Sequence, residues 1–76
     1  MEAYFAEFPV RSKPSQLDQH EGEELIYVFK GRLAVNINGT DSLLETGDAM
    51  YFDAAVPHSY RSDGKTSSTA IIAVAK

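Results

Sequence analysis

The sequence predicts an all-β domain, a sandwich or closed barrel of about seven short antiparallel strands. Apolar residues recur with a period near two, and turn-forming residue pairs interrupt the chain at short intervals. No segment combines helical periodicity with capping residues. The strands are expected near residues 3–8, 24–30, 32–37, 40–45, 48–53, 57–62 and 67–75.

The strand expected at 24–30 is apolar on both faces. Ile26 and Val28 share one face with Glu24, and the other face is equally apolar (Leu25, Tyr27 and Phe29). A strand of this kind is buried on both sides, as in a sandwich or at a dimer contact.

Four residue pairs predict the turns. Asn38-Gly39 is the strongest signal, because both residues tolerate the positive φ of a type I′ hairpin. Asp63-Gly64 predicts a second hairpin, while Lys30-Gly31 and Thr46-Gly47 separate other strands.

The final strand contains the apolar run 70–75 and would promote aggregation on an exposed edge. We therefore expect it to be a central strand, and a dimer would cover it well.

Length and composition point to one small domain, residues 1–76. A chain of this size buries only about 60% of its unfolded surface and usually needs a disulfide, a metal or a partner subunit. The chain has no cysteine, so a metal or self-association remains, and we expect a homodimer.

The charge distribution excludes some partners. The net charge is −4 and the lysines and arginines are scattered, so this chain alone should not bind nucleic acid. The sequence shows no signal peptide and no apolar run long enough to cross a bilayer, which favours a cytoplasmic location without membrane contact.

Asp18, His20 and Glu24 share parity, so on a strand their side chains would leave the same face. His20 and Glu24 would nevertheless lie about 13 Å apart on an extended strand. They converge on one site only if the chain bends between them, and Gly22 is the residue that permits a bend. His58 and Tyr60 share a face on a later strand, which makes Tyr60 a candidate pocket residue.

The stretch 20–31, with His20 four residues before Glu24 and Gly31 seven residues after it, resembles the first motif of the cupin family. Gly47-Asp48 followed by residues 52–58 resembles the second motif, which supplies a further histidine at His58. The two motifs lie near residues 18–31 and 47–58. The resemblance implies a jelly-roll barrel, or double-stranded β-helix, with a pocket between its sheets.

The same resemblance implies a site at His20, Glu24 and His58, with Asp18 where the family usually has another histidine. These four residues would be the metal ligands, and together with Tyr60 they would bind a small molecule. Two imidazoles with one or two carboxylates suit zinc, iron, manganese or nickel. The alternative is a metal-free polar pocket in which the histidines hydrogen-bond a ligand or water.

Residues 47–54 and 57–61 are most similar to the carboxy-terminal sensor cupins of bacterial helix-turn-helix (XRE-type) regulators. This resemblance implies an effector-sensing regulatory domain that binds a small molecule, either part of a transcriptional regulator or a stand-alone relative, with no catalytic residue assigned. A small metal-dependent enzyme (a dioxygenase, isomerase or decarboxylase) is the alternative. A purely structural dimerisation module would leave the inward polar residues unexplained.

Overall fold

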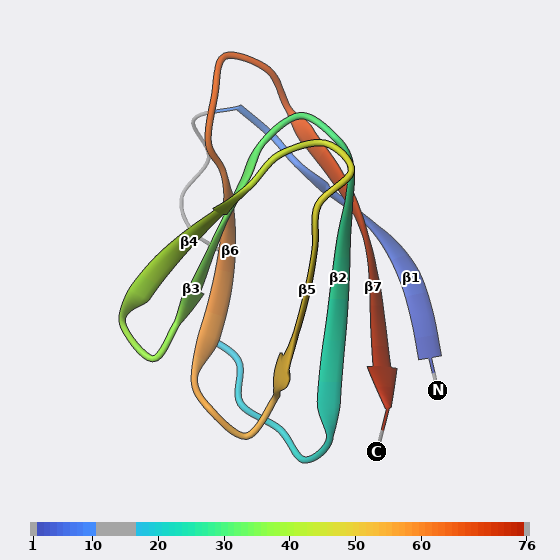
Figure 1. The fold of residues 1–76 in the computed structure, drawn as a ribbon, viewed down its shortest axis with the longest axis vertical. Helices are drawn as coiled ribbons and strands as arrows, with labels where there is room; N and C mark the ends of the chain where they lie inside the picture. The colour runs from blue at the N-terminus through green and yellow to red at the C-terminus, as the bar shows by residue number, and fades with distance from the viewer. Residues whose placement is uncertain (1, 11–16, 76) are drawn as a thin grey trace.

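A computed structural model describes residues 2–10 and 17–75. Short strands alternate with turns along this part of the chain (Figure 1). The strands are β1 (Glu2–Phe8), β2 (Glu23–Lys30), β3 (Leu33–Ile37), β4 (Thr40–Leu44), β5 (Ala49–Asp53), β6 (His58–Ser62) and β7 (Ser68–Ala75). Every strand begins and ends within one residue of its predicted limits. The all-β fold class predicted from the sequence is confirmed.

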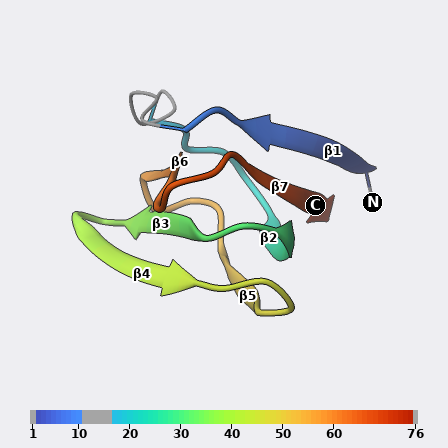
Figure 2. The same cartoon turned by 90° about the horizontal axis from the view of Figure 1, so that it is seen from above.

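The strands form two antiparallel sheets that face each other. One sheet has the order β1-β7-β2-β5 and the other the order β4-β3-β6. Figure 2 shows the two sheets from above, with β3 and β4 on one side and β1, β7 and β2 on the other. The apolar strand β7 lies between β1 and β2, so its predicted central position is confirmed.

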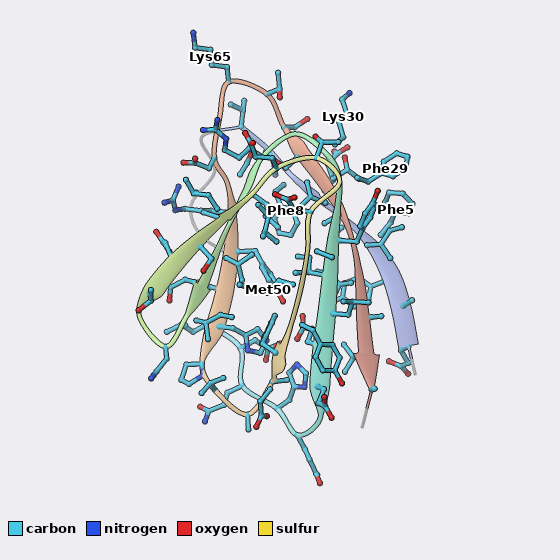
Figure 3. All side chains as sticks on the ribbon, viewed as in Figure 1. Phe5, Phe8, Phe29, Lys30, Met50 and Lys65 are labelled. Atoms are coloured by element: carbon cyan, nitrogen blue, oxygen red, sulfur yellow. The ribbon has the colours of Figure 1, made fainter. Side chains whose placement is uncertain are left out.

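The core lies between the sheets and is built from the inward side chains of both. Phe8 and Met50 point into this space in Figure 3 and pack against the buried cluster. The buried cluster consists of Ile26, Val28, Leu33, Val35, Leu44, Tyr60, Ala70 and Ile72. Burial of these side chains is the main favourable contribution to folding, because apolar surface leaves water.

The Asn38-Gly39 prediction is confirmed. Asn38 has a φ of 50° and Gly39 a φ of 90°, and the turn joins β3 to β4 as direct antiparallel neighbours. Positive φ at both central residues is the requirement of a type I′ turn.

The prediction of a second hairpin at Asp63-Gly64 is wrong. These residues do form a turn region, but β6 pairs with β3 in one sheet while β7 pairs with β1 and β2 in the other. The connection 63–67 therefore crosses from sheet to sheet. Turn-forming residues report a local change of direction, whereas strand pairing depends on contacts distant in sequence.

The outer face of β2 is not buried within the single chain, so the expected burial on both faces is met on the inner face only. Leu25, Tyr27 and Phe29 are 39%, 40% and 57% exposed. Their neighbours on the inner face, Ile26 and Val28, are fully buried.

Residues 2–10 and 17–75 contain no helix with the length and hydropathy of a membrane span.

Candidate metal centre and pocket

Glu24 is a carboxylate buried between the two sheets. It lies on the inner face of β2 and is only 2% exposed. The hydroxyl of Tyr60, which points inward from β6 of the other sheet, donates a hydrogen bond to Oε1 of Glu24. This contact leaves Oε2 of the carboxylate facing the two histidines.

His58 approaches that oxygen from the start of β6. Its Nε2 lies 3.0 Å from Oε2 of Glu24, and the residue is 1% exposed. Its other ring nitrogen, Nδ1, lies 2.8 Å from the carbonyl oxygen of Val56. Because a carbonyl oxygen only accepts hydrogen bonds, Nδ1 carries a proton and donates it.

His20 reaches the same oxygen from the segment before β2. Its Nε2 lies 3.1 Å from Oε2 of Glu24, and its Nδ1 lies 3.2 Å from the carbonyl oxygen of Glu21. The chain bends after His20 as predicted, since Gly22 has a φ of 107°, a conformation that favours glycine. The amide of His20 donates to the carbonyl of Ala54, at 2.9 Å, and fixes the segment against the turn before β6.

Asp18 lies beside the two histidines at the surface. Its backbone amide and carbonyl form an isolated antiparallel bridge with His58, at 2.8 and 2.9 Å. Its Oδ2 lies 3.8 Å from Nε2 of His20, and its side chain is 68% exposed. Asp18, His20 and His58 present ligand atoms within 4.8 Å of one another, close enough to share one metal ion.

The donor atoms of this cluster fit a divalent cation. Both histidines hold their Nδ1 against a backbone carbonyl, an arrangement that orients metal-binding imidazoles and fixes their tautomer. Both Nε2 atoms then point at a single carboxylate oxygen of Glu24. Three acceptor groups aimed at one another need a cation between them, either protons on the imidazoles or a metal ion.

The electrostatic environment sets the proton positions. The hydrogen bond to the Glu21 carbonyl raises the pKa of His20; desolvation opposes this effect, and the carboxylates of Glu24 and Asp18 reinforce it. Burial, followed by the hydrogen bond to Glu24, strongly raises the pKa of Tyr60. Tyr60 therefore keeps its proton and acts as a hydrogen-bond donor to Glu24.

A cavity of about 520 Å³ opens directly onto this cluster. Its polar end is formed by Asp18, Glu24, His58 and Tyr60. The remaining walls come from β1, the segment before β2 and β7, and consist of Tyr4, Ala6, Phe8, Leu17 and Ile72. His20 is connected to the cavity through its contact with Glu24.

The sequence interpretation named the polar end of the cavity but not its apolar walls. Tyr4 and Phe8 were missed, although the alternation in β1 contains a usable signal. Glu7 marks one face of that strand as outward, so Tyr4, Ala6 and Phe8 lie on the other face. The carbonyls of Glu21 and Val56 that orient the histidines have no sequence signature.

The comparison with known protein families assigns the chain to one of them. The family model described as "Cupin domain" matches residues 4–74, which is nearly the whole chain. The chain belongs to the cupin domain family. No protein of curated function matches this cupin in sequence.

Solved structures resemble the cupin along almost its full length. The Drosophila melanogaster CENP-C bound to CAL1 has a TM-score of 0.83 at 16% identity, over 96% of this chain and 63% of that one. The Fe(II) form of HppE has a TM-score of 0.80 at 21% identity, over 96% and 42%. A predicted oxalate decarboxylase from Thermotoga maritima has a TM-score of 0.78 at 28% identity, over 96% and 65%. The cupin thus spans less than two thirds of each of these proteins.

Proposed function

We propose that this cupin binds a small molecule in the cavity between its sheets and acts as an effector-sensing regulatory domain. The observation that carries the proposal is the contact of a cavity of about 520 Å³ with the buried polar groups of Glu24, His58 and Tyr60. Cavities of this size are typical of small-molecule sites. The likeness of residues 47–54 and 57–61 to the sensor cupins of helix-turn-helix regulators supports the regulatory role.

His20, Glu24 and His58 would hold a divalent metal ion at the polar end of the cavity, with Asp18 as a further ligand. Nitrogen and carboxylate ligands of this kind suit zinc, iron, manganese or nickel. A bound ion would supply a positive charge at this end of the cavity and could bind a donor atom of the ligand. Tyr60 would keep Glu24 in its orientation through the hydrogen bond to Oε1.

The cavity walls indicate the chemical class of the ligand. The apolar walls suit a compact apolar body, and the polar end suits a group that interacts with metal or carboxylate. Among the described lining residues there are two carboxylates and neither lysine nor arginine. Without metal the site favours a neutral or cationic head group, whereas a bound ion would reverse this preference towards a carboxylate.

Sensing requires that the ligand bind two arrangements of the protein with different affinity. A ligand that favours one arrangement of a cupin dimer would shift the population towards it. In a regulator with paired DNA-binding domains, this shift would change their spacing on the half-sites.

The test separates metal binding from ligand binding. Protein treated with a chelator is titrated by calorimetry with Zn²⁺, Mn²⁺, Ni²⁺ and anaerobic Fe²⁺. Thermal shifts are then measured with small carboxylates, sugars and amines, with and without the best metal. We expect one metal ion per chain and a metal-dependent shift for at least one carboxylate.

His58→Ala should abolish metal binding, while the control Ser59→Ala, at the next residue of β6, should retain it. Equal metal binding by both variants would contradict the assigned ligands. If no small molecule shifts the melting temperature in either state, the sensor assignment is wrong.

A metal-dependent enzyme is the second candidate, and one observation favours it. Two histidines and one carboxylate with open positions are the ligand set of ferrous oxygenases, and the Fe(II) HppE structure shares the fold. The 28% identical structure is described as a predicted oxalate decarboxylase. Oxygen consumption or decarboxylation that depends on added metal and is lost in His58→Ala would select this function.

A further inference from the structure

The outer surface of the four-stranded sheet is apolar across all four strands. The strand registers align two cross-strand rows on this surface, Ala3–Ala73–Leu25–Tyr51 and Phe5–Ile71–Tyr27–Ala49. Phe29 lies two residues beyond Tyr27 on β2, and its ring centroid is 5.8 Å from that of Phe5 in the second row. Figure 3 shows Phe5 and Phe29 side by side on the outside of the sheet. We name these nine residues the outer apolar face.

The side chains of this face are open to solvent in the single chain. Phe5, Tyr51 and Phe29 are 64%, 62% and 57% exposed, and Leu25 and Tyr27 are close to 40%. Contiguous apolar patches above a few hundred Å² mark interaction surfaces on soluble proteins. The opposite sheet has one large exposed apolar side chain on its outer surface among the described residues, Leu43.

The exposed area of the face is large enough to form the greater part of a dimer interface. A fully exposed aromatic side chain presents about 200 Å², so the four aromatic residues together expose about 450 Å². The aliphatic members and the flanking Glu23 and Lys30 add to this area, and each partner of a standard interface buries about 800 Å².

The charged residues at the two ends of the outer apolar face favour one orientation of the two copies in a dimer. Strand β2 begins with Glu23 and ends with Lys30, and both flank the apolar rows. Glu23 is next to Asp53 of β5, so that end of the face is acidic. A two-fold axis along the strands would set these acidic ends against each other. An axis across the strands, between Leu25 and Tyr27, brings Lys30 of each copy towards Glu23 of the other.

We propose that a second copy of this chain packs on the outer apolar face, with the two β2 strands antiparallel across a two-fold axis and Lys30 of each copy paired with Glu23 of the other. The same patch then serves both subunits, as an isologous interface requires. The sheets pack face to face in the manner of an aligned sandwich. The proposal does not depend on the identity of the ligand.

The first test is the mass of the full chain in solution, measured by sedimentation velocity from about 1 to 100 μM. We expect twice the 8.4 kDa of one chain. Leu25→Glu places a charge at the centre of the face and should give a monomer. Leu43→Glu is the matched control on the other sheet and should remain dimeric. Tyr51→Glu, on the edge strand β5, gives a second monomeric variant should Leu25→Glu fail to fold.

The second test is a charge exchange that reports the orientation. Lys30→Glu and Glu23→Lys should each weaken the dimer about tenfold, and the double variant should recover most of the loss. A monomeric wild-type chain at 100 μM would overturn the proposal and assign the face to another partner. Dimers of equal strength in Leu25→Glu and Leu43→Glu would also overturn it, and a double variant without recovery would refute the antiparallel geometry.

Discussion

The hydroxyl of Tyr60 on β6 donates to Oε1 of Glu24 on β2, and this hydrogen bond joins the two sheets at the polar end of the cavity. Oε2 of the same carboxylate faces both imidazoles. Tyr60 is therefore a positioning residue, which acts on the site through the orientation of Glu24.

Tyr60→Phe should weaken metal binding about tenfold without abolishing it, because loss of a partner that orients a ligand typically costs 10–100-fold. Tyr4→Phe removes a hydroxyl from the same cavity and serves as the control. Calorimetric titration with Zn²⁺ compares the two variants. Equal affinities would show that Tyr60 does not position Glu24.

Glu24→Gln should abolish metal binding without lowering the stability of the metal-free protein. The amide preserves the acceptor for Tyr60, and its NH₂ group can donate to the imidazole Nε2 atoms that face it. We expect the metal-free variant at pH 8 to melt at the wild-type temperature or higher, while the metal-dependent rise in melting temperature disappears.

Glu21→Gln, at a neighbouring exposed residue, should keep the metal-dependent rise. A Glu24→Gln variant that still gains stability from metal would remove Glu24 from the proposed ligand set.

Gly31 and Gly47 allow a matched test of backbone strain. Both have positive φ, 82° and 93°, but a Cβ at Gly31 would lie 2.7 Å from the carbonyl oxygen of Ser67, whereas one at Gly47 meets nothing within 4 Å. Gly47→Ala should cost about 1–2 kcal/mol from the left-handed conformation alone. Gly31→Ala should cost a further 1–3 kcal/mol or so, because the added methyl group overpacks the site.

Urea denaturation at one fixed protein concentration measures both glycine variants, since self-association would add a concentration dependence. Equal losses at the two positions would contradict the close approach of Ser67 to Gly31.

The carboxylate of Asp41 should contribute stability that disappears in acid. Hydrogen bonds from Asn36, at 2.9 Å, and Arg61, at 3.0 Å, lower the pKa of Asp41. A carboxyl group with a lowered folded-state pKa stabilises the protein above its unfolded pKa, and this stability is lost as the pH falls through the folded pKa. Asp41→Asn should therefore lower the urea midpoint slightly at pH 7 and have less effect at about pH 2.5. A difference that stays constant over this range would contradict the prediction.

The sequence predicts the strands well because their signals are local. The continuous apolar run from Leu25 to Phe29 defines β2, and the positive φ tolerated by Asn38 and Gly39 defines one hairpin. Strand partnership is not local, which is why Asp63-Gly64 was misinterpreted as a hairpin. The site follows the same division: parity places Tyr60 on the side of His58, but only the resemblance to cupins links His58 with Glu24, which is 34 positions away.

Neighbouring residues of β2 serve opposite sides of its sheet. Glu24 reaches the cavity, while Leu25, the next residue, points to the exterior. One peptide unit connects the two, so a sideways displacement of either is a displacement of both. Few substitutions along this strand should therefore be neutral. Random mutagenesis with selection for folded protein that binds ligand should yield fewer accepted substitutions in β2 than in any other strand.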